Sequence, residues 1–124
     1  MKEYKFIIEE KLPSLNEYIL ACRRSAHVGN RFKNETDMIC AVYIKQAGIP
    51  AIKKPVKVDF EWHEKTDKRD PDNVSGYGHK TIFDALVSCG VLKNDSKRYV
   101  KGHSDEYIKD KKDFIVVTIK EQEK

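Results

Sequence analysis

Apolar side chains alternate with polar ones between Val56 and Trp62, and this pattern limits the possible folds more than any other in the sequence. Val56, Val58, Phe60 and Trp62 share one face of a strand, because successive side chains of a strand point to opposite sides. Such a strand is half-buried. The stretch therefore predicts a sheet covered on one side, from which the chain runs toward Asp70.

Two helices are predicted before this strand. Ser14 and Glu17 have the spacing of a capping box, which favours a helix from there to about Arg24. Residues 25–33 are polar and basic, so we expect a loop. A second helix is then expected to begin with Asn34 as its cap and to end at Gly48. Its expected buried positions have helical spacing and are Met38, Ile39, Val42 and Tyr43.

A third helix is predicted only over residues 79–88, because the glycines of Gly76-Tyr77-Gly78 weaken a helix interior. Its apolar stripe consists of Ile82, Phe83, Leu86 and Val87. Further strands are expected over residues 4–8, 99–109 and 113–120, the last two as a hairpin. The resulting order, β-α-α-β-α-β-β, favours an α+β fold, a small mixed β-sheet with helices packed on it.

Length and composition favour a small one-domain protein without a membrane span. With 124 residues it is one domain, residues 1–124, with a single core. No apolar run is long enough for a membrane span, and the first residues lack the apolar stretch of a signal peptide, so we expect a cytosolic protein. Three cysteines at wide spacing, Cys22, Cys40 and Cys89, indicate neither a disulfide framework nor a zinc knuckle.

The segment Asp70-Pro71-Asp72 carries the most suggestive chemistry. Pro71 disfavours the helical region for Asp70, so Asp70 is predicted to be extended. If the extended conformation continues, both carboxylates point to the same side. Mg²⁺ takes oxygen ligands and typically one or two carboxylates together with substrate phosphates. The pair therefore suits a hard divalent cation, although a D-x-D segment in a loop is common without one.

Basic residues flank this segment, and the formal net charge is +4. A site that admits a polyanion needs such a rim, because neutralised phosphates supply most of the non-specific affinity. Solvated surface charge is an equally good reading of any one cluster. The candidate DNA-binding residues are Arg23, Arg24, Arg31, Lys33, Lys68, Arg69, Lys97 and Arg98.

Other metal and nucleophile chemistries find no support in the spacing. An EF-hand loop beginning at Asp70 lacks the required glycine and the final glutamate. The histidines and cysteines lack zinc-ligand spacing, and no serine or cysteine nucleophile motif is present. Lys80 precedes Asp84 by four residues, which fits a surface ion pair, or else a cation on the first turn of the third helix, near Asp72.

Several short motifs follow one another along the chain, namely Pro13-Ser14-Leu15-Asn16, Arg69-Asp70-Pro71-Asp72-Asn73, Lys80, Phe83-Asp84-Ala85-Leu86, Gly90-Val91-Leu92 and Asn94-Asp95. In this order they resemble the motifs of the RusA family of Holliday junction resolvases, which are typically of phage or prophage origin. The chain departs from the family pattern by a few additional residues around Ser75 to His79. The position of Lys80 is therefore matched through its spacing to Phe83.

The resemblance implies a metal-dependent crossover junction endodeoxyribonuclease that acts in DNA recombination and repair. By position, Asp70, Asp72 and Asp95 correspond to the family's Mg²⁺ or Mn²⁺ ligands, and Lys80 to a required lysine. Family members are homodimers that nick two opposed strands of a four-way DNA junction. Two other readings stay open: a non-catalytic binder of structured nucleic acid, in which the aspartates cap a helix, and a metal nuclease acting on RNA or on other branched DNA.

Overall fold

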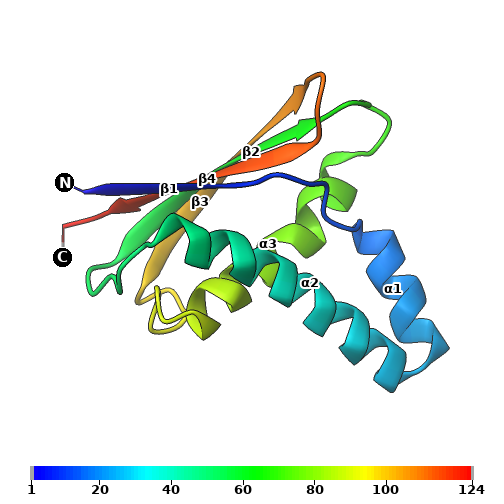
Figure 1. Ribbon diagram of the computed structural model, residues 1–124, viewed down its shortest axis with the longest axis horizontal. Helices are drawn as coiled ribbons and strands as arrows, with labels where there is room; N and C mark the ends of the chain where they lie inside the picture. The colour runs from blue at the N-terminus through cyan, green and yellow to red at the C-terminus, as the bar shows by residue number, and fades with distance from the viewer. Residues whose placement is uncertain (1, 124) are drawn as a thin grey trace.

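A computed structural model describes residues 2–123 and shows a four-stranded sheet with three helices. The fold is α+β, with the predicted order of elements. In Figure 1 the sheet forms one layer, and helices α2 and α3 lie against the same face of it. The strands are β1 (Glu3–Ile8), β2 (Val56–Glu64), β3 (Val100–Lys109) and β4 (Phe114–Glu121).

The strand order is β1-β4-β2-β3, so the predicted hairpin between the last two strands is wrong. β2 lies between them, antiparallel to β4 and parallel to β3. The reason is burial. Alternate residues of β2 are buried along its whole length, which suits a central strand, whereas no residue of β3 is fully buried. β3 therefore occupies the edge.

Helix α1 (Leu15–Arg24) begins with the predicted capping box. The Ser14 hydroxyl oxygen accepts from the Glu17 backbone N–H at 3.1 Å, and the Glu17 carboxylate accepts from the Ser14 N–H at 3.0 Å. Both contacts satisfy backbone donors that the first turn leaves free.

Helix α2 (Ala26–Ala47) starts far earlier than predicted, which corrects both the loop at residues 25–33 and the cap at Asn34. Ser25 is the actual cap, because its hydroxyl oxygen accepts from the Val28 N–H at 3.0 Å. Gly29 lets this end of α2 approach α1 closely, since a Cβ there would lie 2.7 Å from Cys22 Sγ. The end at Gly48, with φ of 66°, is as predicted.

The buried face of α2 differs from the prediction in part. Of the four expected positions, Ile39 and Tyr43 are partly buried against the core, but Met38 and Val42 are 68% and 52% exposed. The fully buried residues of this face are Thr36, Cys40 and Ile44. Four-residue spacing places these three on one face, and its polar member, Thr36, accepts a hydrogen bond from the buried Tyr77 hydroxyl at 2.8 Å. A pattern that counts only apolar residues therefore misses this face.

Helix α3 (Pro71–Ser88) also begins earlier than predicted and contains the glycine-rich segment. Both glycines are sites of close packing. A Cβ at Gly78 would lie 2.6 Å from the Trp62 ring, and one at Gly76 would lie 3.3 Å from Leu15 Cδ2. At Gly78 the close approach of the Trp62 ring outweighs the lost helix propensity of about 1 kcal/mol. No helix within residues 2–123 has the length and apolar character needed to cross a membrane.

The thiol of Cys40 is expected to be unreactive in the folded protein. Burial raises its pKa to about 12, and the side chain has no exposed surface, whereas Cys22 is exposed. Because the thiolate is the nucleophile, an aromatic disulfide reagent at pH 8 should modify Cys40 at least about 100-fold more slowly than Cys22. Mass-spectrometric mapping of the labelled thiols measures this. Equally fast labelling of both in the native protein would contradict the packing of α2.

Candidate metal and nucleic-acid site

The N-terminal end of α3 carries Asp70 and Asp72. Asp70 is extended, as predicted, with φ −76° and ψ 164°, and it caps the helix by accepting from the Asn73 N–H at 3.2 Å. Asp72 lies in the first turn, so the expected extended geometry stops at Asp70. Both residues are exposed. Because the helix begins at Pro71, the two carboxylates do not share one side of an extended chain as expected, but the positive end of the helix dipole favours negative charge at both positions.

Two contacts hold this end of the helix in place. Arg69 forms a two-pronged ion pair with Glu64, and both side chains are largely buried. The Asn73 side-chain oxygen accepts from the Asn16 N–H at 3.1 Å. The structure therefore joins the early P-S-L-N motif to the R-D-P-D-N motif. Arg69 positions the loop before Asp70, which leaves its guanidinium unavailable as a surface contact for DNA.

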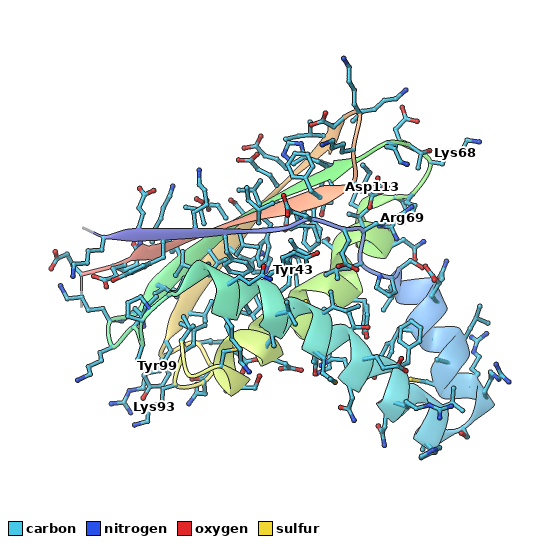
Figure 2. The ribbon with its side chains drawn as sticks, in the orientation of Figure 1. Tyr43, Lys68, Arg69, Lys93, Tyr99 and Asp113 are labelled. Atoms are coloured by element: carbon cyan, nitrogen blue, oxygen red, sulfur yellow. The ribbon has the colours of Figure 1, made fainter. Side chains whose placement is uncertain are left out.

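Asp95 lies at the opposite end of α3, in the loop before β3. This loop contacts the start of β2, where the Val56 N–H donates to the Tyr99 carbonyl at 2.8 Å. An 18-residue helix is about 27 Å long. Figure 2 shows Lys68 and Arg69 at one end of the molecule and Lys93 and Tyr99 at the other. A single chain therefore does not bring Asp95 to Asp70 and Asp72.

Lys80 lies in the middle of α3, which corrects its expected place on the first turn. It is about 12 Å farther along the helix axis than Asp72. Its side chain is 61% exposed, and Nζ lies 3.9 Å from Asp84 Oδ2. An exposed pair at this distance contributes little to stability. The Lys80 ammonium is thus available to solvent between the two acidic ends of the helix.

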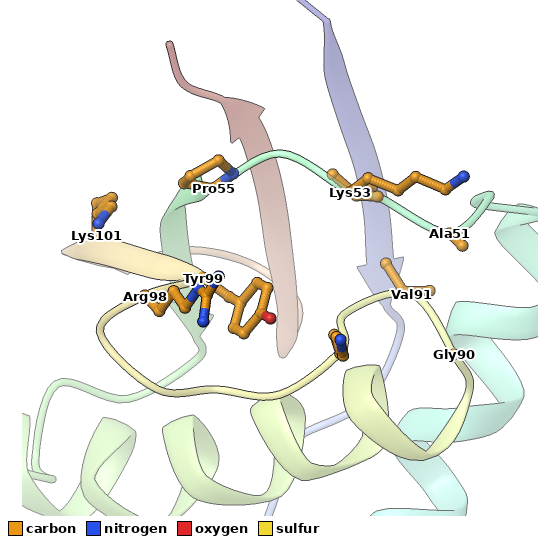
Figure 3. Close-up of a pocket in the computed structure, with 10 residues that line it drawn as sticks. Ala51, Lys53, Pro55, Gly90, Val91, Arg98, Tyr99 and Lys101 are labelled. Carbon is orange, nitrogen blue, oxygen red and sulfur yellow. The ribbon is translucent and has the colours of Figure 1, made fainter. Parts of the chain in front are cut away.

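A basic pocket lies beside the loop that carries Asp95 (Figure 3). Its volume is about 710 Å³. The lining residues come from the segment before β2, from the segment between α3 and β3, and from the start of β3, and they are Ala51, Ile52, Lys53, Pro55, Gly90, Val91, Lys93, Arg98, Tyr99 and Lys101. Four of them are cationic. The Arg98 guanidinium carbon lies 5.8 Å from the centre of the Tyr99 ring. Cations around an aromatic ring suit phosphate groups and stacked bases.

The other predicted DNA-binding residues fall into two groups. The exposed ones are Arg23, Arg24, Arg31, Lys68 and Lys97. Lys33, by contrast, is largely buried and lies 2.7 Å from both Asp37 and Asp84. Burial disfavours its charged form, but hydrogen bonds to the two carboxylates outweigh burial and raise the pKa of Lys33. Lys33 therefore joins α2 to α3.

Between α3 and β3 the structure brings together a set of polar side chains that the sequence does not predict. We call His79, His103 and Asp105 the His/Asp cluster. His79 Nε2 lies 2.6 Å from Asp105 Oδ1, and His103 Nδ1 lies 3.4 Å from Asp105 Oδ2. Burial lowers the pKa of His79, and the Asp105 carboxylate opposes this shift only in part.

The sequence contains one signal for the His/Asp cluster. His103 and Asp105 are two residues apart on a strand, so they share a face. Recognising the third member requires the pairing of β3 with β2, which sets β3 beside α3. The spacing of the histidines along the chain matches no metal-ligand motif, so the sequence alone does not indicate a histidine site.

No protein-family model matches this chain, and a search of curated proteins likewise finds no match.

Proposed function

We propose that the protein is a metal-dependent endodeoxyribonuclease that resolves four-way DNA junctions by paired nicks, in recombination and repair. One observation carries this proposal: exposed carboxylates of the predicted motif lie at both ends of α3, beside exposed cations. The resemblance to the RusA family assigns these same carboxylates to the metal. In this reading Asp70, Asp72 and Asp95 are the ligands and Lys80 contacts the substrate.

The donor set at the N-terminal end of α3 fits Mg²⁺ or Mn²⁺. Asp72 is exposed, and Asp70 uses one oxygen for the helix cap and retains the other. Carboxylate oxygens are the ligands that these hard cations take, usually with several waters and substrate phosphates. A bound divalent cation supplies a polarised phosphate and an activated water. Asp70 and Asp72 would hold the cation, and Lys80, about 12 Å farther along α3, would contact another phosphate of the bound DNA.

Because one chain separates Asp95 from the other two carboxylates, the complete site requires a second chain. A two-fold symmetric homodimer that sets the N-terminal end of α3 against the partner's loop before β3 forms two identical sites. Each site then combines Asp70 and Asp72 with Asp95 of the partner subunit. Two sites related by a two-fold axis also match a substrate in which two opposed strands are cut.

The basic pocket gives the DNA a place close to Asp95. Lys53, Lys93, Arg98 and Lys101 neutralise phosphates, and Tyr99 offers a stacking surface. Arg23, Arg24, Arg31, Lys68 and Lys97 extend the positive surface. Lys33 and Arg69 are left out of this DNA-binding set, because their charges are already paired inside the protein.

The direct test is cleavage of a labelled immobile four-way junction in Mg²⁺ or Mn²⁺. Linear duplex, flap, fork and RNA duplex substrates are compared under the same conditions. We expect symmetric paired nicks on the junction and little cleavage of linear duplex. Preferential cleavage of flaps, forks or RNA would instead assign another metal nuclease. Absence of metal-dependent scission on every substrate would contradict the proposal.

A second candidate is a non-catalytic binder of structured nucleic acid, which the capping role of Asp70 favours. In that case the carboxylates stabilise α3 and hold no metal. Isothermal titration with Mn²⁺ separates the two functions. A nuclease should have a saturable Mn²⁺ site that is lost in Asp72→Asn, whereas a non-catalytic binder should have no such site. Junction binding without scission would support this second candidate.

The double variant Lys93→Ala/Arg98→Ala is expected to weaken junction binding. It should also reduce the slope of log Kobs against log salt concentration by about 1 to 2, one for each lost phosphate contact. Fluorescence anisotropy over a salt series measures both effects. The control is Lys112→Ala, an exposed lysine in the loop between β3 and β4. Equal slopes in the double variant and the wild type would show that the basic pocket does not contact the DNA.

A further inference from the structure

The His/Asp cluster joins two elements through side chains that commonly bind metal ions. His79 projects from α3 toward the sheet, and His103 and Asp105 lie on the same face of β3. One ligand atom from each residue lies within 4.8 Å of the other two. Along the helix axis His79 is about 10 Å from Asp72, so this cluster is separate from the carboxylates at the end of α3.

The three ligand atoms lie within 4.8 Å of one another, so they must close by up to about 1.5 Å to reach the spacing around a tetrahedral ion. Zinc bonds of about 2.0 to 2.1 Å place the ligand atoms of a tetrahedral ion about 3.3 Å apart. The distance of 3.4 Å between His103 Nδ1 and Asp105 Oδ2 already fits. The contact of 2.6 Å between His79 Nε2 and Asp105 Oδ1 opens by less than 1 Å when a metal replaces the hydrogen bond.

Surrounding residues orient the ligands. The Trp62 indole N–H donates to Asp105 Oδ1 at 2.8 Å, which fixes the carboxylate on the side of α3. The Phe60 ring packs against both imidazoles, tilted toward His79 at a ring-centre distance of 4.8 Å and edge-on to His103 at 6.1 Å. Outer contacts of this kind hold metal ligands in position, and an apolar surrounding strengthens the attraction between a cation and the carboxylate.

The cluster is also accessible. The His79 and Asp105 side chains are 20% and 17% exposed, whereas that of His103 is 43% exposed. An ion can therefore enter at the edge of the sheet, beside β3. Three protein ligands leave at least one coordination position for water or a substrate atom, which is the arrangement of open rather than purely structural zinc sites.

We propose that His79, His103 and Asp105 form a binding site for a divalent transition metal of the Zn²⁺ class. Two imidazoles and one carboxylate favour Zn²⁺, Co²⁺ or Ni²⁺ over Mg²⁺, which prefers an all-oxygen shell. The ion fastens the edge strand β3 to α3, since its ligands come from both elements. The inference does not depend on the proposed nuclease function, because it uses none of the residues assigned there.

The test uses the purified full-length protein after treatment with a chelator. Isothermal titration with Zn²⁺ is expected to show one site per chain, with a dissociation constant in the micromolar range or tighter. Co²⁺ should give the visible absorption of a four- or five-coordinate ion. Zinc at 100-fold above its dissociation constant should raise Tm by about 5 to 10 °C, because the metal binds the folded state.

Three variants assign the site. His103→Ala, at an exposed edge position, should weaken zinc binding at least about 100-fold and remove the cobalt absorption. His27→Ala, an exposed histidine on α2, and Asp67→Asn, an exposed carboxylate in the loop before α3, should leave both unchanged. Circular dichroism confirms that His103→Ala is folded. The proposal is overturned by the absence of saturable zinc binding, by equal binding in His103→Ala, or by loss of binding in His27→Ala or Asp67→Asn.

Discussion

Replacing Asp72 by asparagine is expected to lower the rate of junction cleavage at least about 1,000-fold while junction binding persists. Asparagine keeps the size of the side chain but removes the negative charge that would hold the cation. The helix should tolerate the change, because Asp70 and not Asp72 accepts the capping hydrogen bond. Binding should be equal or tighter, since one negative charge near the phosphates is lost.

Cleavage and binding are measured on the same labelled junction, with single-turnover kinetics in Mn²⁺ and anisotropy in its absence. Asp67→Asn is the matched control, because Asp67 is exposed and lies in the loop just before the motif. It should cut at the wild-type rate. If Asp72→Asn cuts as fast as the control, Asp72 is not a metal ligand, and the nuclease assignment loses its main support.

The second large effect is on stability. Gly78→Ala is expected to lower the free energy of unfolding by about 2 to 4 kcal/mol, because its Cβ would lie 2.6 and 2.7 Å from two atoms of the Trp62 ring. Trp62 is 2% exposed and stacks on Phe60, so the ring has little room to move. The clash exceeds the gain in helix propensity of about 1 kcal/mol.

Gly76→Ala provides a matched control on the same helix. Its nearest neighbour is the end of the flexible Leu15 side chain at 3.3 Å, and Gly76 itself is exposed. Helix propensity should then dominate, so the stability should stay the same or rise by up to about 1 kcal/mol. Urea denaturation of both variants gives the comparison. Similar stabilities for the two would show that Trp62 does not pack against Gly78.

Local signals were sufficient where a single contact decides the structure. The capping box of Ser14 and Glu17, the left-handed Gly48 and the extended Asp70 all follow from one or two residues. The burial of alternate residues in β2 follows from its apolar pattern. For the three caps the deciding atoms lie within four residues along the chain, whereas the period of two in β2 identifies its buried face without identifying what covers it.

Predictions that depend on distant contacts were wrong. The start of α3 was missed because Gly78 is read as a helix breaker until Trp62 is known to pack on it. The hairpin was wrong because β2 separates β3 from β4. The His/Asp cluster was missed for the same reason. The order of the aspartates along the chain is evident from the sequence. The distance between Asp70 and Asp95 is not, because it depends on α3 being longer than predicted.

The central claim is that each nuclease site combines Asp72 of one subunit with Asp95 of the other, and mixed dimers test it most directly. Asp72→Asn and Asp95→Asn are each expected to be inactive alone. When they are co-expressed with different tags, half of the dimers are mixed, and each mixed dimer has one intact site, so about a quarter of wild-type nicking should return. Mixed dimers, isolated through both tags, should nick one strand. If they remain as inactive as the two parents, the shared site is contradicted.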